Sequence, residues 1–306
     1  MTSRYPAASG QPASLRQRVL ADLTAADCSP LHRFGQNFMV DERVLADLCA
    51  ALPLALGARV VEIGPGTGIL TTRLLDAGAQ VLAVEIDRGL TAWLQTSLVP
   101  RGLVLVHGDA LAGKSRLNPA IETFAADGPW MLASNLPYDV AIPVLLEAAA
   151  LPRQPLAIAA TVQFECGRRL CSRPGEDAWG ASAAVFQAAG EPRLVRRIGR
   201  DAFHPRPNVD SAIVAWTPRA PLPPGFSTWV RAVFAYRRKV LPGALRDAGL
   251  TREAAEAACA RAGIDPARRL EGLDAAELMA LHGAMERGAP APTGPRGSCP
   301  ASTPSA

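Results

Sequence analysis

Short apolar runs alternate with helix-like stretches through the first half of the chain. The helix-like stretches repeat their apolar residues every three or four positions, as amphipathic helices do. The apolar runs have the length and composition of buried strands, and they cover Arg59–Ile63, Gln80–Glu85, Leu103–His107, Trp130–Ser134 and Leu156–Val162. This alternation predicts an α/β fold, in which helices cover both faces of a mostly parallel sheet.

The pattern changes after residue 181. Further strand-like runs are Ser182–Ala188, Arg193–Ile198 and Ser211–Thr217. The proline-rich residues 218–224 then read as a linker, and the spacing over 226–287 predicts helices only. We therefore expect a larger domain over 31–217 and a small all-helical domain over 218–287.

The two ends of the chain differ from its middle. Residues 1–30 form an N-terminal extension, in which 1–13 read as disordered and 14–27 as a short amphipathic helix with Leu15, Val19 and Leu23 on one side. Residues 288–306 are rich in Pro, Gly, Ser and Thr, a composition that cannot build a core. We predict a disordered tail there.

Composition narrows the class of protein. Of 306 residues, 49% are hydrophobic, yet no apolar run reaches the roughly 20 residues needed to span a bilayer. No secretory signal is visible, and the six cysteines show neither a C-x-x-C pair nor zinc spacing. These features predict a cytoplasmic protein with reduced thiols, no bound metal and no membrane association. We expect a monomer.

Positive charge is concentrated in one region. Residues 161–240 carry 13 Lys and Arg against 6 Asp and Glu, although the whole chain has a net charge of only +4. The clusters could bind nucleic-acid phosphates or could be ordinary solvated faces of an Arg-rich protein. The candidates for RNA binding are Arg168, Arg169, Arg206, Arg237, Arg238 and Lys239.

A Gly-rich turn follows the first strand-like run. Gly64, Gly66 and Gly68 have the spacing G-x-G-x-G, and Glu62 stands two residues before the first glycine. A dinucleotide site prefers G-x-G-x-x-G, and a carboxylate is a poor companion for pyrophosphate. The motif instead suits a cationic ligand such as S-adenosylmethionine, and a structural turn without a ligand is the alternative.

Two more acids follow the next strand-like runs. Glu85 lies 19 residues after Gly66, a spacing at which an acid can bind ribose hydroxyls. Asp109, beside Ala110, could accept a hydrogen bond from an adenine amino group. Carboxyl groups at three successive strand ends, together with a glycine loop, predict a nucleoside site.

The stretch Ser134–Tyr138 reads Ser-Asn-Leu-Pro-Tyr and follows a buried strand. The Asn135 oxygen and a backbone carbonyl of Leu136 or Pro137 can accept both hydrogens of an exocyclic amine, while Tyr138 stacks on the ring. A strand end followed by a Pro turn is the plainer interpretation of this stretch alone.

Together these segments resemble the ribosomal RNA adenine dimethyltransferases, in particular the bacterial small-subunit enzymes, over roughly 34–285. The segments that carry the resemblance are 35–41, 62–68, 84–87, 108–110, 135–138, 163–165, 203–212, 237–239 and 264–269. The resemblance implies a Rossmann-like class I S-adenosylmethionine-dependent methyltransferase. It also implies that the small helical domain contacts RNA and that the substrate is 16S RNA of the small ribosomal subunit, which the enzyme helps to mature.

The resemblance also implies roles for single residues. Tyr138 and Phe203 would stack on opposite faces of the target adenine, and Asn135 would face the methyl donor. The residues expected around the cofactor are Asn37, Met39, Glu62, Gly64, Gly66, Gly68, Glu85, Ile86, Asp109, Ala110 and Asn135.

The chain departs from the family pattern at a few positions. Asp139 replaces the usual Asn, Met39 a Leu, and Trp179 a Tyr. Pro242-Gly243 follows the basic triplet 237–239, where we expect the proline to interrupt the helix and to remove an interaction with RNA.

Other functions stay open on the sequence alone. A large-subunit adenine methyltransferase of the macrolide-resistance type usually has Ile where Leu136 stands. A largely non-catalytic assembly or RNA-binding factor would not need the site residues that this chain keeps. A small-molecule methyltransferase would need neither the basic region nor the helical domain.

Overall fold

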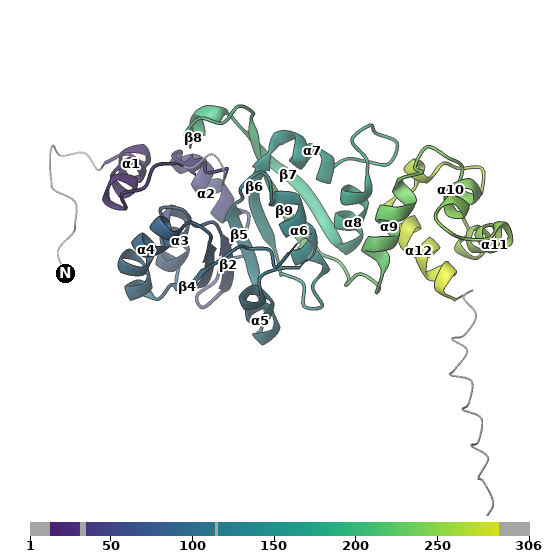
Figure 1. The fold of residues 1–306 in the computed structure, drawn as a ribbon, viewed down its shortest axis with the longest axis horizontal. Coiled ribbons are helices and arrows are strands. Elements are labelled where there is room, and N and C mark those ends of the chain that lie inside the picture. The colour runs from purple at the N-terminus through teal and green to yellow at the C-terminus, as the bar shows by residue number, and fades with distance from the viewer. Residues whose placement is uncertain (1–12, 31–34, 114–115, 288–306) are drawn as a thin grey trace, which may run out of the picture. The chain divides into compact units, whose positions relative to one another are not determined.

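The protein is described by a computed structural model that covers residues 13–30, 35–113 and 116–287 (Figure 1). The chain divides into two compact units, with the boundary between Ser227 and Thr228. The predictions of disorder for the first twelve residues and for 288–306 lie outside the described residues.

A seven-stranded sheet forms the centre of the first unit, with strand order β4-β3-β2-β5-β6-β9-β7. The strands from β4 to β6 run parallel, and β9 and β7 pair antiparallel at the other side. Their bounds are β2 Arg59–Ile63, β3 Gln80–Glu85, β4 Val104–His107, β5 Met131–Asn135, β6 Ile158–Gln163, β7 Gly190–Ile198 and β9 Ser211–Pro218. A separate pair joins β1 (Phe38–Met39) to β8 (Phe203–His204).

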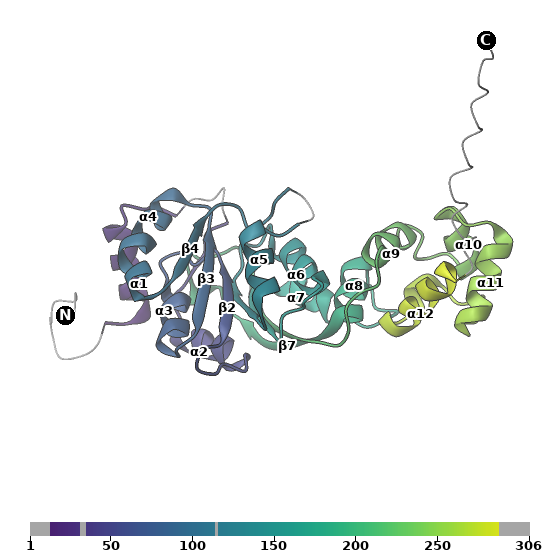
Figure 2. The ribbon, with the colours of Figure 1, turned by 90° about the horizontal axis from the view of Figure 1, so that it is seen from below.

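Helices connect the strands and pack along the sheet (Figures 1 and 2). In the first unit they are α1 Leu15–Ala25, α2 Glu42–Ala50, α3 Ile69–Asp76, α4 Arg88–Ser97, α5 Pro119–Asp127, α6 Ala141–Ala150, α7 Phe164–Leu170 and α8 Ala181–Ala189. Short 3-10 helices cover Val99–Arg101 and Arg200–Ala202. The α/β prediction is therefore confirmed, with five of the predicted strands in the parallel part.

One predicted strand is wrong. Residues 182–188 lie within helix α8. The segment is buried on nearly every side, so its apolar residues form a continuous run without the period of an amphipathic helix. Alanine has a high intrinsic helix propensity, and this propensity favours a helix in a segment whose apolar pattern has no clear period.

The predicted N-terminal helix is present as α1, and it is part of the core. Ser14 caps the helix through a reciprocal capping box with Gln17. The side chains of Leu15, Val19 and Leu23 are all buried, as the spacing predicts. They join one apolar cluster with the residues of the sheet and its helices.

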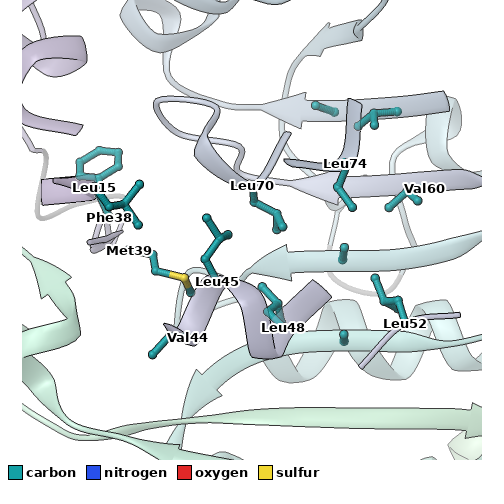
Figure 3. Packing of buried hydrophobic residues seen from close by; sticks show 14 of the residues in the cluster. Leu15, Phe38, Met39, Val44, Leu45, Leu48, Leu52, Val60, Leu70 and Leu74 are labelled. Carbon is teal, nitrogen blue, oxygen red and sulfur yellow. The ribbon is translucent and has the colours of Figure 1, made fainter. Parts of the chain in front are cut away.

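That cluster contains residues of strand β2 and of the helices α2 and α3. Figure 3 shows Leu45 and Leu48 of α2 together with Leu70 and Leu74 of α3. Val60 of β2 packs in the same cluster and is fully buried. This packing holds the carboxyl end of β2, where the Gly-rich turn begins, in a fixed position.

Helix α9 (Phe226–Phe234) spans the boundary between the units, and the second unit continues with α10 (Leu241–Asp247), α11 (Arg252–Ala262) and α12 (Ala275–Glu286). A short 3-10 helix covers Leu270–Gly272. The expected interruption at Pro242 is wrong, because this proline lies in the first turn of α10. Backbone N–H groups in a first turn have no acceptor within the helix, so a proline there costs no hydrogen bond. α9 has already ended at Phe234.

Among the helices within the described part of the chain, none is both long and apolar enough to cross a membrane.

Candidate active site

The Gly-rich turn joins β2 to α3 with backbone angles that glycine favours. Gly66 has a φ of +60°, and a Cβ at this position would lie only 3.0 Å from the Phe38 ring. Gly68, with a φ of +86°, is the N-cap of α3. A side chain at either position would strain the backbone and crowd its neighbours, so the turn stays open at the carboxyl edge of the sheet.

Glu62 lies at this edge with only 2% of its surface exposed. Its Oε2 accepts a 2.6 Å hydrogen bond from the Thr71 hydroxyl of α3. Burial raises the pKa of the Glu62 carboxyl to about 8, the Thr71 bond opposes this shift, and the nearby Glu85 adds to it. A cationic partner would therefore favour the ionised form of the Glu62 carboxyl group.

Glu85 ends the neighbouring strand β3 and is equally enclosed. Its two oxygens accept hydrogen bonds from the backbone N–H groups of Gly66, at 3.1 Å, and Asp87, at 2.9 Å. Burial raises the pKa of the Glu85 carboxyl to about 7, although these bonds oppose the shift. The carboxyl group ties the Gly-rich turn to the end of β3.

One cavity is lined by both carboxyl groups and by the Ser-Asn-Leu-Pro-Tyr stretch. It lies at the carboxyl ends of β2, β3 and β5, where open α/β sheets bind their ligands. The predicted residues on its wall are Asn37, Met39, Glu62, Gly64, Gly66, Glu85, Ile86, Asn135, Leu136, Pro137 and Tyr138. Gly68 is not among them, because it caps α3 instead.

A second cavity adjoins the first and contains the third predicted acid. Asp109 and Ala110 line it, and Gly64, Ile86 and Pro137 are shared by the walls of both cavities. The Asp109 Oδ1 accepts a 2.9 Å hydrogen bond from the Leu111 N–H, which fixes the carboxylate at the loop after β4. Ile86 is 40% exposed and offers an apolar surface to a flat ring.

A third cavity shares part of its wall with the first. Residues 35–37 and Tyr138 belong to the walls of both, and Pro30, Gln163 and residues 205–209 also line the third. The Tyr138 hydroxyl forms a 2.7 Å hydrogen bond with the Ser211 hydroxyl at the start of β9. Tyr138 is thereby anchored at the border between the two spaces.

Asn135 ends β5 and lies on the wall of the first cavity. Its Nδ2 donates a 2.8 Å hydrogen bond to the Asn37 carbonyl, and its Oδ1 accepts from the Thr161 hydroxyl of β6. The Leu136 N–H donates to the Thr161 carbonyl at 3.2 Å, and the Val140 N–H to the Pro137 carbonyl at 3.2 Å. The Asn135 oxygen keeps a second lone pair for a ligand.

Phe203 takes a different position from the one that the resemblance implies. Its ring is 1% exposed and packs in the apolar cluster, where the residue pairs with Met39 of β1. Phe203 is not on the wall of any of the three cavities. Its stacking on a base stays a prediction, and the buried ring gives that prediction no support.

The six predicted RNA-binding residues are divided between the two units. Arg168 pairs with Glu165 at 3.4 Å and Arg206 with Asp201 at 3.1 Å, whereas Arg169 is exposed on α7. In the second unit, Arg237 lies 3.9 Å from Glu271, Lys239 pairs with Asp247, and Arg238 is exposed. Arg206 alone among the six lines one of the three cavities.

The family departures fall in different places. Asp139 is on the wall of the second cavity, next to the Asp109 region, and Met39 is on the wall of the first. Trp179 is buried with 1% of its surface exposed, away from the three cavities. No group of three or more potential metal ligands occurs among residues 13–30, 35–113 and 116–287.

Sequence reasoning missed the hydroxyl groups that hold the site. Thr71, Thr161 and Ser211 are each fully buried and each bonded to a site residue. A polar residue inside an otherwise apolar run was the available signal, because a buried hydroxyl needs a partner. Which partner it finds depends on strand register, which the sequence does not give.

Two solved structures share this fold. The first is the 23S rRNA methyltransferase ErmE, with a TM-score of 0.60 and 24% identity, covering 82% of this chain and all of that chain. The second is a dimethyladenosine transferase from Plasmodium falciparum, with a TM-score of 0.65 and 18% identity, covering 82% and 98%. At these identities the likeness shows the fold alone, an α/β Rossmann-like methyltransferase.

Sequence comparison is more specific. The curated protein "Ribosomal RNA small subunit methyltransferase A" of Phenylobacterium zucineum is 36% identical over 273 residues, covering 86% of this chain and 92% of that protein. The family model described as Ribosomal RNA adenine dimethylase matches residues 31–285. The chain therefore belongs to the ribosomal RNA adenine dimethylase family.

Proposed function

We propose that this protein dimethylates adenine N6 in the 16S RNA of the small ribosomal subunit and thereby contributes to maturation of that subunit. Family membership and the name of the Phenylobacterium relative support the reaction and the subunit. The single observation that carries the proposal is the position of Asn135. Asn135 lies on the wall of the cavity with the buried carboxyl groups, and its amide donates to the carbonyl of Asn37, which also lines the cavity bounded by Gln163 and 205–209.

The residues of the first two cavities fit S-adenosylmethionine. Glu62 and Glu85 are buried carboxyl groups with raised pKa values, and a ligand that carries positive charge would stabilise their ionised forms. In the proposed arrangement Asn37 and the backbone at Met39 hold the methionine part. Glu85 binds the ribose, and Asp109 with Ile86 holds the adenine. When bound, the cofactor supplies an electrophilic methyl group.

Asn135 orients the acceptor amine. The N6 lone pair of adenine is delocalised into the ring, so the amine is a weak nucleophile unless it is turned and partly pyramidalised. The Asn135 Oδ1 accepts one N–H, and a backbone carbonyl accepts the other. The Pro137 carbonyl already accepts the Val140 N–H, which favours the Leu136 carbonyl for this role.

No strong base is required among these residues. Once methylated, the nitrogen carries a positive charge and loses its proton readily. The second transfer requires that the monomethylated amine turn and present its lone pair again. It then has one N–H to donate, so either the Asn135 oxygen or the Leu136 carbonyl is left free at that stage.

The RNA must deliver an extruded base, because a stacked adenine cannot reach the methyl donor. We assign the third cavity to this base, with Tyr138 against its face. The exposed arginines of α7 and the basic triplet 237–239 of the helical domain would hold surrounding phosphates. The protein would act in the cytoplasm as a monomer.

The proposal is tested with labelled methyl donor and isolated ribosomal subunits from cells that lack this modification. We expect label in small subunits, recovered after digestion as N6,N6-dimethyladenosine. The Asn135→Ala protein is the matched control, since it keeps the carboxyl groups that bind the donor. Label confined to large subunits would favour the macrolide-resistance type of activity. Tight binding of small subunits without any transfer would favour an assembly factor.

A further inference from the structure

We propose that Thr161 is a positioning residue for methyl transfer, which acts by holding the Asn135 amide in its productive orientation. This inference rests on the proposed function and extends it to a residue outside the Ser-Asn-Leu-Pro-Tyr stretch. Thr161 belongs to β6, and it is not on the wall of any of the three cavities. Thr161 would influence methyl transfer only through its hydrogen bond to the Asn135 side chain.

The two residues are neighbours because of strand register. β5 and β6 pair in parallel with Asn135 opposite Thr161, so their side chains leave the same face at the carboxyl edge of the sheet. On its other side, Thr161 is opposite Ile213 of β9. A residue that is paired on both sides in the middle of a sheet has a fixed backbone. Its β-branched side chain is also restricted at χ1.

The hydrogen bonds leave one consistent orientation of the amide. The Asn37 carbonyl can only accept, so the group that faces it at 2.8 Å must be the Asn135 NH2. The Asn135 oxygen then faces Thr161, whose hydroxyl must be the donor. A flipped amide would set two carbonyl oxygens against each other. The two contacts therefore specify which end of the amide faces Thr161 and which faces Asn37.

This orientation is the one that the reaction needs. An sp² oxygen has two lone pairs, and the Thr161 hydroxyl uses one of them. The other can accept an N–H of the adenine amine. Without the hydroxyl, the Asn135 side chain gains rotational freedom, and some of its conformers direct the NH2 group at the amine, where it cannot accept. Removal of the Thr161 hydroxyl should therefore lower the rate of methyl transfer and leave the affinity for the methyl donor unchanged.

Thr71 provides a matched contrast. It is also a fully buried threonine that donates to a site side chain, but its partner is the Glu62 carboxyl group of the donor cavity. If each threonine acts through its partner, Thr161→Val should lower kcat, and Thr71→Val should change the affinity for S-adenosylmethionine. A merely structural role would make the two variants alike.

The experiment measures kcat for small-subunit methylation, the Kd of S-adenosylmethionine and the melting temperature of each variant. For Thr161→Val we expect kcat to fall about tenfold, the loss of one hydrogen bond that orients a catalytic group. The Kd should stay within about twofold. Thr161→Ser keeps the hydroxyl and should restore most of the activity. If Thr161→Val does not fold, the pair Thr161→Ala and Thr161→Ser isolates the same hydroxyl.

Three results would overturn the proposal. One is a kcat of wild-type size in Thr161→Val, another is a Ser variant no better than the Ala variant, and the third is a parallel loss of kcat and donor affinity. Failure of the wild-type protein to methylate small subunits would instead contradict the proposed function. In that case the orientation of the Asn135 amide can still be tested by its side-chain amide resonances in NMR, which should shift in Thr161→Val and return in Thr161→Ser.

Discussion

Two polar regions of this protein are built in opposite ways. Around the first cavity, Glu62 and Glu85 on its wall and Thr161 behind Asn135 are each at most 3% exposed and have hydrogen-bond partners within the protein. In the basic region, the side chains of Arg168 and Lys239 are more than half exposed in their ion pairs. Burial away from water shifts the pKa values of carboxyl groups, and the hydrogen bonds of buried side chains fix their orientation. Exposed ion pairs contribute only about 0–1 kcal/mol to stability, so their side chains can exchange partners easily.

The difference suggests a division of labour. In the proposed function, the buried network would determine which atom is methylated, and the exposed cations would provide affinity for RNA. An exposed arginine that gives up a carboxylate for a phosphate loses little, so the ion pairs of Arg168 and Arg206 do not exclude RNA contacts.

The largest effect is expected from Asn135→Ala. The variant loses the acceptor for the amine, so methyl transfer should fall by about a hundredfold to a thousandfold, the size of loss found when one hydrogen-bonding group at a reacting centre is removed. Donor affinity, measured by calorimetry, should stay within about tenfold because Glu62 and Glu85 remain. Turnover near the wild-type rate would remove the role assigned to Asn135.

The next effect concerns the buried carboxyl groups. The free protein keeps Glu62 protonated below its raised pKa of about 8, so binding of a cationic donor should release a proton and tighten as pH rises from 6 to 8. Glu62→Gln should weaken donor binding by about tenfold to a hundredfold and reduce this pH dependence to the part contributed by Glu85. Calorimetry in buffers of different ionisation enthalpy counts the protons. An unchanged pH profile in the variant would contradict the account.

The same carboxyl group makes a stability prediction. Its pKa is 4.5 in the unfolded chain and about 8 in the folded protein, so the unfolded state ionises first as pH rises. Without a donor, the free energy of unfolding should therefore decrease between pH 4.5 and 8, and Glu62→Gln should make this decrease smaller, leaving the part that Glu85 contributes up to about pH 7. Chemical denaturation at several pH values measures it. A decrease as large in the variant as in the wild type would mean that Glu62 does not contribute to it.

A smaller effect, on RNA binding and its dependence on salt, is expected from the basic triplet. Replacing Arg237, Arg238 and Lys239 by Ala should weaken RNA binding at low salt and make the plot of log K against log salt shallower by about 1–3 units. Arg252→Ala is the control, because Arg252 is an exposed arginine of the same unit that pairs with Glu256. A salt slope unchanged by the triplet would place the basic face elsewhere.

The smallest effect is expected within the helical unit. Arg268 donates to the Glu277 carboxylate and to the Gly272 carbonyl. The Arg268 bond lowers the pKa of Glu277, so its stabilisation is present above pH 4.5 and is lost as pH falls through the lowered value. Because the pair is about one-third exposed, Glu277→Gln should cost no more than about 1 kcal/mol of unfolding free energy. A much larger loss would show that this exposed pair behaves like the buried network.

Much of the fold could be predicted from periodicity because most strands here are short apolar runs between clear helical patterns. The prediction failed at 182–188, where an alanine-rich helix is buried on nearly all sides and has no polar face to reveal its period. It also failed at Pro242, because a proline in a first helical turn and a proline that breaks a helix look alike until the start of the helix is known.

The site was predictable where one residue type performs one task. The glycines of the turn and the acids at the strand ends are visible from spacing alone, and the structure places Glu62, Glu85 and Asn135 around one cavity. The supporting hydroxyl groups were not predictable, since Thr161 meets Asn135 only through the pairing of β5 with β6. The buried position of Phe203 likewise depends on the pairing of β8 with β1.

The most direct test of the account is a crystal structure of the protein with S-adenosylhomocysteine and an adenosine nucleotide. We predict that the cofactor product lies against Glu62 and Glu85. The adenine should fill the space beside Tyr138 with its N6 about 2.6–3.2 Å from the Asn135 Oδ1. An Asn135 amide turned away from the adenine, or a purine bound outside the third cavity, would contradict the central claim.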